Sequence, residues 1–389
     1  MSPWRRRRTE GRRLRIVVVE PDLEENGAIR VDLERVRRWR HLGADVVIVA
    51  LECGEEEDRA PVPAGVDVRF VTRRPRRFRH VYALGLVKVW WLARRADVVM
   101  SGREMQFGVL LASTAARAAR RPLAVTMHSW LEKAMAEHVE PRFREATRKA
   151  VRTADLVVCV SEGLTTAALE AGVPGERVRV VKNGIDAEEV RRLALLAPEV
   201  ALPDGPLVVG CGRLNDEKGF DTLVRAHARA LALGAPAHSI VVVGEGPRRD
   251  LLVELAEELG VAGTVSFPGF TRNPWAVMGR ADLFVLPSRF EGLTLTLLEA
   301  LALAVPMAAS RCAGPEELLE GGTFGMLFPL EDVEALATSI RDHLRSPDDL
   351  RRRAAAGPAL VAERYSVASA AQQHLDLIEA LVGSRRRAT

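Results

Sequence analysis

The sequence predicts an α/β protein of two units, each with a parallel sheet covered by helices on both faces. Short apolar runs rich in β-branched residues alternate with longer helical stretches in the first half, and this alternation restarts in the second half. Residues 193–206 separate the halves, because prolines and Gly205 interrupt the rhythm there. A length of 389 residues also exceeds what one ordinary core supports.

The first half contains seven expected strands. Each is a short run of apolar residues bounded by turn signals, and they cover residues 15–19, 45–50, 67–71, 97–100, 123–128, 155–160 and 177–181. Helical stretches such as 31–43 lie between them. We expect residues 1–13 to form a flexible basic arm and residues 14–200 to form the first domain.

The second half contains five expected strands, and we assign residues 204–360 to a second domain. The strands cover residues 207–212, 239–246, 264–270, 282–288 and 306–310. An amphipathic helix at about 361–382 follows the second domain and is expected to pack back on the first. The dipeptide Ala-Asp opens a strand at residues 96, 154 and 281, which predicts a recurring corner between helix and strand.

Composition excludes several classes of protein. Apolar residues make up 48% and charged residues 28% of the chain, as expected for a folded soluble protein. Cys53, Cys159, Cys211 and Cys312 form no CxxC pair, which predicts neither a disulfide framework nor a zinc site and favours a reducing compartment. No apolar run approaches the roughly 18 residues of a membrane helix, and the basic start lacks a signal peptide's apolar segment. We therefore expect a cytoplasmic protein.

Positive charge is clustered although the net charge is only +4. Arginine blocks lie at residues 5–8, 73–80 and 385–387, and such blocks favour anionic surfaces or are simply solvated segments. Residues 72–95 combine arginines with Tyr82, Trp90 and Trp91, a mixture that suits a membrane interface. A buried tryptophan pair beside an exposed loop is the alternative. No pattern of a nucleic-acid reader accompanies the arginines, so the predicted partner is an anionic membrane, contacted peripherally.

Ligands of open parallel sheets bind beyond the carboxyl ends of the strands. After the first strand of the second half come Gly212, Arg213 and Lys218, where a phosphate meets amides and side-chain charge, unless the charges are ordinary surface ones. Lys218 is one of only five lysines against fifty-one arginines. Asn215 occupies the third glycine position of GxGxxG, so the dinucleotide fingerprint is absent. Gly244 lies near the end of the next expected strand and marks either a close approach or a plain left-handed turn.

The segment RFEGLTLTLLEA, residues 289–300, places two carboxylates at the start of an apolar helix. Glu291 lies in the loop, and the helix is expected to begin near Thr294 to Thr296. The free amides of a helix start suit a diphosphate, and flanking carboxylates accept hydrogen bonds from sugar hydroxyls. Glu299 either faces the same ligand or closes a capping box with Thr296.

Two positions in the first half are further candidates. His128 ends the strand at 123–128, where a functional residue is expected, although a lone histidine is often a satisfied structural one. Asn26 and Gly27 lie just before the first helix and can pass close to a bound phosphate.

In this order the motifs resemble those of the retaining glycosyltransferases of family four. The resemblance covers nearly the whole chain, is strongest from about residue 204 to 330, and rests on GRLNDEKGFDTLVRA, VVVGEGP, VSFPGF, ADLFVLPSRFEGLTLTLLEALALAVP, GGTFGMLF and NGID. It implies the GT-B fold, in which two Rossmann-like, doubly wound domains face a cleft and the first domain lies on the acceptor side.

The resemblance also implies roles for the candidate residues. The donor is a nucleoside diphosphate sugar, with UDP favoured and GDP next. Arg213 and Lys218 hold its diphosphate together with the amides of Leu295 and Thr296. Other implied contacts are those of Glu291 with the sugar hydroxyls, Glu299 with the ribose, Gly27 with the phosphates and His128 near the reactive carbon. The chain departs from the family at Ala304, where glycine is common, and in having Gly27 without a paired glycine.

The resulting expectation is transfer of a hexose-type sugar to a glycan, lipid-linked or small-molecule acceptor, with retention implied by the resemblance. No Asp-x-Asp motif is well placed at a strand end, so Arg213, Lys218 and helix amides are expected to replace a metal ion, and no cofactor is predicted. The alternatives are a related phosphorylase, a nucleotide-sugar epimerase, or a non-catalytic subunit that binds nucleotide sugars.

Overall fold

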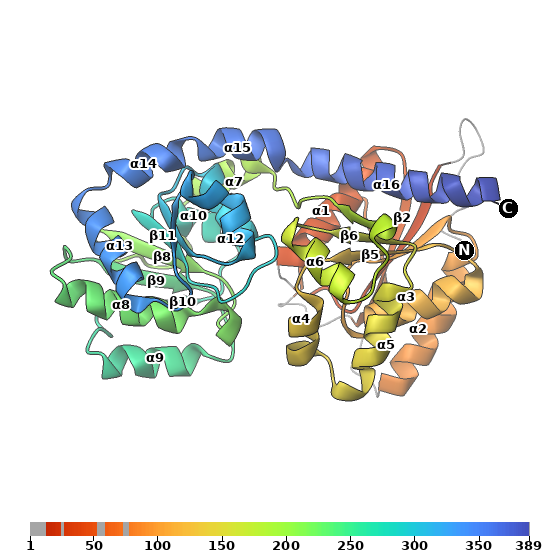
Figure 1. The fold of residues 1–389 in the computed structure, drawn as a ribbon, viewed down its shortest axis with the longest axis horizontal. Helices are drawn as coiled ribbons and strands as arrows, with labels where there is room; N and C mark the ends of the chain where they lie inside the picture. The colour runs from red at the N-terminus through yellow and green to blue at the C-terminus, as the bar shows by residue number, and fades with distance from the viewer. Residues whose placement is uncertain (1–12, 25–26, 53–58, 73–77, 389) are drawn as a thin grey trace. The chain divides into compact units, whose positions relative to one another are not determined.

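The computed structural model describes residues 13–24, 27–52, 59–72 and 78–388. The chain divides into two compact units (Figure 1). The first unit comprises Met1–Asn183 and Val367–Thr389, and the second comprises Gly184–Ser366. Almost all of the expected basic arm, as well as Cys53, lies outside the described residues.

The first unit is built on a parallel sheet of seven strands with the order β3-β2-β1-β4-β5-β6-β7. Its strands are β1 (Arg15–Glu20), β2 (Asp45–Glu52), β3 (Asp67–Thr72), β4 (Val98–Ser101), β5 (Leu123–Met127), β6 (Leu156–Cys159) and β7 (Val178–Val180). Its helices are α1 (Gly27–His41), α2 (Phe78–Ala93), α3 (Gln106–Ala119), α4 (Leu131–His138), α5 (Pro141–Arg152), α6 (Gly163–Glu170) and α16 (Val367–Ala388).

Helices cover the first sheet, so its central strands are mostly apolar and buried. Val17, Val18 and Val19 of β1 are all buried, as a doubly covered parallel strand requires. The helix α16 contacts α1. Trp39 of α1 is fully buried, and its indole nitrogen donates a hydrogen bond of 2.8 Å to the carbonyl of Ala371 in α16. The last helix of the chain therefore completes the core of the first unit.

The second unit has a parallel sheet of six strands with the order β10-β9-β8-β11-β12-β13. Its strands are β8 (Leu207–Cys211), β9 (Ser239–Val243), β10 (Val265–Gly269), β11 (Leu283–Leu286), β12 (Met307–Ser310) and β13 (Met326–Phe328). Its helices are α7 (Ala187–Ala194), α8 (Phe220–Ala232), α9 (Arg249–Glu258), α10 (Pro274–Met278), α11 (Leu295–Ala302), α12 (Ala313–Leu318), α13 (Val333–Arg345), α14 (Asp348–Ala355) and α15 (Gly357–Arg364).

Each sheet has one point where the strand order reverses. In the first sheet β1 lies between β2 and β4, and in the second β8 lies between β9 and β11. At such a switch point the connections leave in opposite directions and open a crevice at the carboxyl ends of the two strands. The functional side chains of each unit are therefore expected after β1 and β4, and after β8 and β11.

The three Ala-Asp corners share one hydrogen-bonding arrangement. The carboxylate of Asp97 accepts a hydrogen bond of 3.0 Å from the amide of Arg15, while the amide of Asp97 donates one of 2.8 Å to the carbonyl of Arg15. Asp155 makes the same reciprocal pair with Leu123, and Asp282 makes it with Leu207. The predicted corner is thus a clamp that joins each of β4, β6 and β11 to its neighbouring strand.

The domain boundary differs from the sequence prediction. Residues 184–200 were assigned to the first domain, but they belong to the second unit, where α7 packs against α10, α11 and α15. The helix expected at 361–382 is two helices, α15 and α16, separated at Tyr365 and Ser366. The amide of Ile185 donates a hydrogen bond of 2.9 Å to the carbonyl of Tyr365, so the two segments that pass between the units lie side by side.

Within residues 13–24, 27–52, 59–72 and 78–388, no helix is both long and apolar enough to cross a membrane.

The Asp97 clamp makes a first testable prediction. Asp97→Ala leaves the half-buried amide of Arg15 without its carboxylate acceptor, and we expect the free energy of unfolding to fall by about 1.5–3 kcal/mol. Asp97→Asn keeps an oxygen acceptor and is expected to cost less than half as much. Equal losses in the two variants, measured by denaturant unfolding, would show that the acceptor oxygen is not what matters.

Candidate functional site

Two of the predicted site residues meet in the second unit. The ammonium of Lys218, in the connection after β8, lies 2.6 Å from Oε1 of Glu291, in the connection after β11. The hydroxyl of Ser288 donates a hydrogen bond of 2.7 Å to the same oxygen. Since β8 and β11 are the neighbours at the switch point, the sheet topology brings these residues together across 73 positions of sequence.

Local contacts fix the Lys218 turn. The side-chain oxygen of Asn215 accepts a hydrogen bond of 3.2 Å from the amide of Lys218, capping a 3₁₀ turn at Asp216–Lys218. Gly219 has a φ of 61°, and a Cβ atom there would overlap the carbonyl oxygen of Pro287. Only glycine therefore allows the Lys218 turn to approach the β11 connection this closely.

Arg289 fastens the same two connections to one another. Its amide donates a hydrogen bond of 2.8 Å to the carbonyl of Glu217, beside Lys218. Its guanidinium contacts Asp221 at 2.9 Å and Glu331 at 2.7 Å. Lys218 and Glu291 are therefore held together by a hydrogen bond between the backbones of their connections as well as by their opposite charges.

The Lys218–Glu291 pair is partly shielded from water. Burial opposes the charge of Lys218, but the carboxylates of Glu291 and Glu217 outweigh it, so the pKa of the ammonium is raised. Burial, and then the charge of Glu291, raises the pKa of the nearby Cys312 thiol to about 11. Lys218 is therefore a fixed cation, and Cys312 is a neutral thiol beside it.

The helix α11 begins at Leu295, with Thr294 as its N-cap residue. Glu299 is then the fifth residue of the helix, two positions too far along to close a capping box, so that interpretation is wrong. Glu299 is nevertheless buried. The first amides of the helix, including those of Leu295 and Thr296, have no partner within the helix, and no side chain caps it. They form a group of donors that favours an anion.

Glycines bring the connections after β8 and β9 into backbone contact. A Cβ atom at Gly244, where φ is 145°, would overlap the carbonyl oxygen of Gly212. The amide of Leu214 donates a hydrogen bond of 2.8 Å to the carbonyl of Glu245 across this contact. Of the two interpretations of Gly244, the close approach is therefore the correct one, and the backbone that it approaches is that of Gly212. Arg213 lies in this connection and is exposed.

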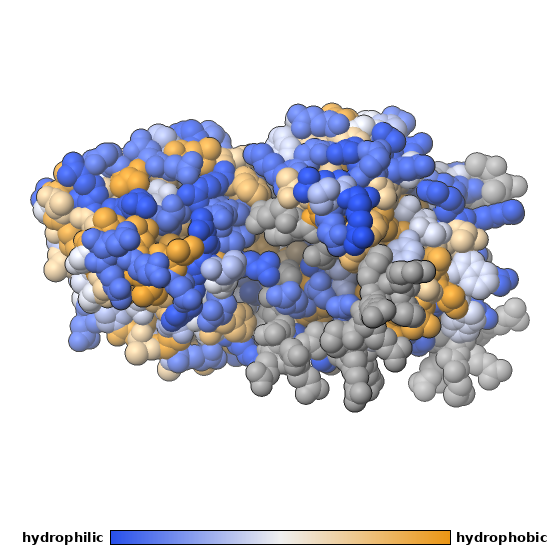
Figure 2. All heavy atoms as spheres, turned by 90° about the horizontal axis from the view of Figure 1, so that it is seen from below, coloured by the Kyte–Doolittle hydropathy of each residue, from blue (hydrophilic) through white to orange (hydrophobic). Residues whose placement is uncertain are grey.

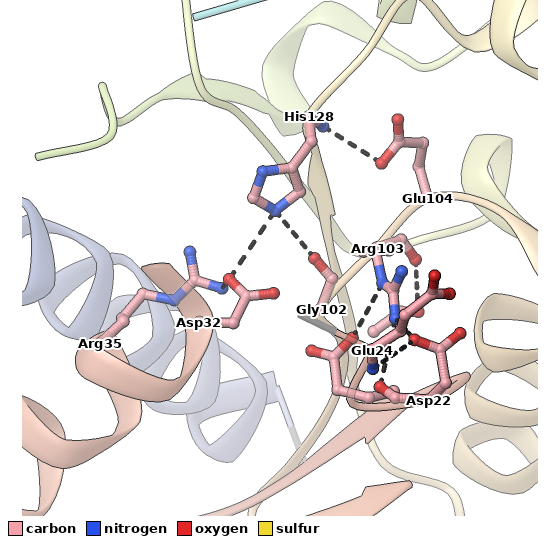
Figure 3. Close-up of polar contacts among 10 residues, drawn as sticks. Asp22, Glu24, Asp32, Arg35, Gly102, Arg103, Glu104 and His128 are labelled. Atoms are coloured by element: carbon pink, nitrogen blue, oxygen red, sulfur yellow. Dashed lines mark hydrogen bonds and ion pairs between the residues drawn. The ribbon is translucent and has the colours of Figure 1, made fainter. Parts of the chain in front are cut away.

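His128 lies in the first unit, at the end of β5 (Figure 3). Glu104 is fully buried and accepts hydrogen bonds from the amides of His128 at 3.1 Å and Ser129 at 2.9 Å, which fixes the backbone. The imidazole Nε2 lies 3.1 Å from the carbonyl oxygen of Gly102 and 3.7 Å from Oδ1 of Asp32. Because a carbonyl oxygen only accepts, Nε2 carries the hydrogen and Nδ1 is left as an acceptor.

Gly27 is the first residue of α1, and Asn26 lies outside the described residues. The described ranges contain no group of three or more His, Cys, Asp or Glu side chains arranged to hold a metal ion.

Sequence reasoning missed four residues of these sites: Asn215, Ser288, Arg289 and Glu104. Asn215 was noted only for breaking a glycine motif, although an Asn three residues before Lys218 is a recognisable cap signal. Ser288 directly follows the apolar run of β11, so its place at a strand end was a usable signal. Arg289 and Glu104 contact residues that are distant in sequence, so no local pattern predicts these contacts.

Two family models match the chain. The model described as Glycosyltransferase Family 4 matches residues 26–189, and the model described as Glycosyl transferases group 1 matches residues 196–358. Together the matches reach from the first unit into the second unit.

Two curated relatives illustrate the similarity in sequence. A lipopolysaccharide core biosynthesis glycosyltransferase of Rhizobium meliloti is 31% identical over 205 residues, which are 52% of this chain and 58% of that protein. A GDP-mannose-dependent α-(1-6)-phosphatidylinositol monomannoside mannosyltransferase of Mycolicibacterium smegmatis is 33% identical over 264 residues, which are 64% of this chain and 67% of that protein. The chain thus spans only part of the length of either relative.

The fold is similar to solved structures. The crystal structure of Anabaena HepE in complex with UDP-glucose superposes with a TM-score of 0.79 and covers 94% of this chain and 100% of that one. The two sequences are 21% identical, so this likeness concerns the fold alone.

The contact at Gly244 makes a second testable prediction. Gly260 also has a positive φ, of 69°, but a Cβ atom there would meet nothing within 4 Å. We expect Gly260→Ala to cost about 1–2 kcal/mol of stability for its backbone conformation alone. Gly244→Ala adds the overlap with Gly212 and is expected to cost about 1–3 kcal/mol more. If thermal unfolding shows the same loss of stability in the two variants, the close approach to Gly212 is not the reason for glycine at position 244.

Proposed function

Because this chain belongs to the group 1 glycosyltransferases and has the GT-B fold, we propose that it is a retaining, metal-independent enzyme. It moves a hexose-type sugar from a nucleoside diphosphate sugar to a hydroxyl group of an acceptor. The observation that carries the proposal is the contact of 2.6 Å between Lys218 and Glu291, four residues before the uncapped start of α11. A cation, a carboxylate and free amides gather there.

The cationic groups of this site suit the leaving nucleotide. When the bond between sugar and β-phosphate breaks, negative charge grows on the phosphate, and a preorganised cation and amides stabilise it. Lys218 is held in place by Glu291, Arg213 is exposed in the adjoining connection, and the amides of Leu295 and Thr296 are free of helix hydrogen bonds. These groups take the role that a divalent metal has in other transferases.

The carboxylates suit the hydroxyl groups of the donor. Ionised carboxylates only accept hydrogen bonds, which matches sugar and ribose hydroxyls and does not match phosphate. We assign Glu291 to the donor sugar and the buried Glu299 to the ribose. Gly27 at the start of α1 is assigned to the phosphates, and His128 to the sugar near its reactive carbon.

Retention requires no enzymic base. The acceptor hydroxyl attacks on the face from which the nucleotide leaves. A new carbon–oxygen bond forms as the bond to the β-phosphate oxygen breaks, and the hydroxyl proton passes to the departing phosphate. The carbonyl of Gly102 directs Nε2 of His128, so its imidazole offers an acceptor nitrogen to a sugar hydroxyl instead of a proton.

The donor base is most simply a uracil, with guanine next. HepE, which has the same fold, was crystallised with UDP-glucose, while the Mycolicibacterium relative is described as GDP-mannose-dependent. The two precedents differ, so the choice rests on a screen of nucleotide sugars for thermal stabilisation of the protein. A donor at 100 times its dissociation constant should add about 2.7 kcal/mol to the stability.

The acceptor is proposed to be lipid-linked, because α2 presents an apolar stripe. Leu84, Val87 and Trp91 are 49%, 65% and 38% exposed, and their spacing places them along one side of the helix. Trp91 is therefore not part of a buried tryptophan pair. Figure 2 looks onto the side of the first unit on which α2 lies in Figure 1, and hydrophobic residues show among hydrophilic ones there.

Arginines accompany this stripe. The guanidinium groups of Arg94 and Arg95 lie 5.0 Å and 4.1 Å from the ring centres of Trp90 and Trp91. An apolar stripe with tryptophans and cations suits the headgroup region of an anionic bilayer. The arginine-rich segment 73–77, which precedes α2 in the sequence, lies outside the described residues. This surface would hold the enzyme at the cytoplasmic face of a membrane.

The anion site makes a third testable prediction. Lys218→Ala should lower kcat by about 100- to 1000-fold, because one fixed charge that stabilises the departing phosphate is lost. Lys149→Ala removes an exposed lysine of α5 and is the matched control. Both variants and the wild type are assayed with nucleotide sugar and acceptor in excess EDTA.

Loss of wild-type turnover in EDTA, with recovery in magnesium or manganese, would contradict a metal-independent mechanism. Equal kinetics of Lys218→Ala and Lys149→Ala would remove Lys218 from the site. Release of an epimer from the nucleotide sugar alone would indicate an epimerase, and turnover that requires inorganic phosphate would indicate a phosphorylase. Tight nucleotide-sugar binding without any turnover would indicate a non-catalytic subunit.

The membrane surface makes a fourth prediction. Leu84→Glu should weaken co-sedimentation with phosphatidylglycerol vesicles by about tenfold or more, because a half-exposed leucine loses its insertion energy. Leu251→Glu, in α9 of the second unit, changes a leucine of equal exposure and should have no effect. Binding that is the same for phosphatidylcholine and phosphatidylglycerol vesicles, or that falls equally in the two variants, would refute the assignment.

A further inference from the structure

A cluster of buried charges lies at the switch point of the first unit, next to His128 (Figure 3). Glu20 ends β1, Asp32 and Arg35 belong to α1, and Arg103 follows β4. Glu20 is 1% and Asp32 2% exposed, so both carboxyl groups are removed from water. Buried charges of this kind are costly unless they are paired, which raises the question of how this cluster is balanced.

One oxygen of each carboxyl group has a cationic partner. Nε of Arg103 lies 3.3 Å from Oε2 of Glu20, and Arg35 forms an ion pair with Oδ1 of Asp32. Arg103 also contacts Oδ1 of Asp22 at 2.9 Å. The second oxygens, Oε1 of Glu20 and Oδ2 of Asp32, are buried and have no hydrogen-bond donor among the described residues.

These two unpartnered oxygens lie beside the same glycine. A Cβ atom at Gly102 would overlap Oε1 of Glu20 and would stand 2.9 Å from Oδ2 of Asp32. Two ionised oxygens placed this way, out of water, repel one another. A hydrogen bond between the two carboxyl groups removes the repulsion and satisfies both oxygens, but it needs one proton.

We propose that Glu20 and Asp32 share a single proton, and that the singly charged pair positions His128 for the reaction proposed above. The proton resides on Glu20, because Asp32 has the closer guanidinium. The inference rests on the proposed function for its effect on turnover, but the shared proton itself does not.

The charges of the cluster balance with that proton in place. Glu20, Asp22 and Asp32 then have two negative charges, opposite the guanidinium groups of Arg35 and Arg103. Burial, followed by the charge of Asp32, raises the pKa of Glu20 well above its usual range, in agreement with the geometry. Among the described residues, the titratable and charged groups around Glu20 are Asp32 and Arg35 of α1, Asp22, Arg103, His128, the exposed Glu24 and, further away on α16, His374.

His374 adds no charge to this balance. It is buried against Trp39, at 5.3 Å between ring centres. Burial, and then the charge of Arg35, lowers its pKa well below the usual range. The imidazole therefore stays neutral, and the proton between the carboxyl groups is what neutralises the cluster.

Gly102 links the carboxyl pair to His128. Its missing side chain makes room for the two oxygens, and its carbonyl accepts from Nε2 of His128 at 3.1 Å. The ionised Oδ1 of Asp32 lies 3.7 Å from the same nitrogen. The pair therefore keeps the hydrogen on Nε2 and leaves Nδ1, on the far side of the ring in Figure 3, as the acceptor. Glu20 and Asp32 are positioning residues in this arrangement.

The test compares Glu20→Ala with Glu20→Gln, in which an amide N–H replaces the carboxylic acid proton. Glu20→Ala should lower kcat by about tenfold to a hundredfold with little change in donor KM, because His128 loses its support. Glu20→Gln should retain most of the wild-type kcat. Asp32→Asn removes the charge that faces Nε2 and should resemble Glu20→Ala. Glu379→Gln, on the exposed face of α16, controls for loss of an acid.

Stability against pH supplies a measurement that does not depend on turnover. A raised pKa in the folded state means that stability is greatest below the unfolded pKa of Glu, about 4.3, and is lost as pH rises through the folded pKa. The melting temperature of Glu20→Gln relative to wild type should therefore increase with pH over this window. The melting temperature of Glu379→Gln relative to wild type should not change with pH.

Infrared spectra of the wild type at neutral pH complete the test, and they need no variant to fold. A carbonyl stretch of a protonated carboxylic acid is expected. Its absence, or a loss of kcat in Glu20→Gln as large as in Glu20→Ala, would overturn the proposal. If wild type transfers no sugar yet shows the infrared band and the pH-dependent stability, the shared proton stands and the proposed function falls.

Discussion

The reciprocal hydrogen bonds of Asp97 and Asp282 fix the register of the two strand pairs on which the sites depend. They join β4 to β1 and β11 to β8, the pairs that flank the switch points. A slip of one residue would turn every side chain of a strand to the opposite face. In the observed register Val19 lies opposite Ser101, so Glu20 comes beside Gly102. The same control in the second sheet lets the Lys218 turn meet Glu291.

The two sites solve opposite electrostatic problems. In the second unit, the ammonium of Lys218, held between Glu291 and Glu217, and the uncapped amides of α11 supply hydrogen-bond donors that suit a diphosphate. In the first unit, the acids and guanidinium groups around Glu20 neutralise one another within the protein. The second unit therefore presents donors to an anion, while the first unit holds the imidazole of His128 in a defined position.

Much of the fold could be predicted from the sequence, because buried parallel strands are short apolar runs. All twelve expected strands are present, whereas β13 was missed. Lys218 and Glu291 were found because each follows the carboxyl end of an expected strand. Glu104 and Arg289 were not, because their partners are distant in sequence. Residues 184–200 were misplaced for the same reason, since contacts of α7 with later helices decide their unit.

The first unit is discontinuous, and this affects the order in which the protein is made. Synthesis proceeds from the amino terminus, so Ser366, the last residue of the second unit, leaves the ribosome before α16 does. Until then Trp39 of α1 lacks its contacts with Ala371 and His374 of α16. The unit translated first is consequently the last to be completed, and its nascent core needs protection from aggregation while the rest of the polypeptide emerges.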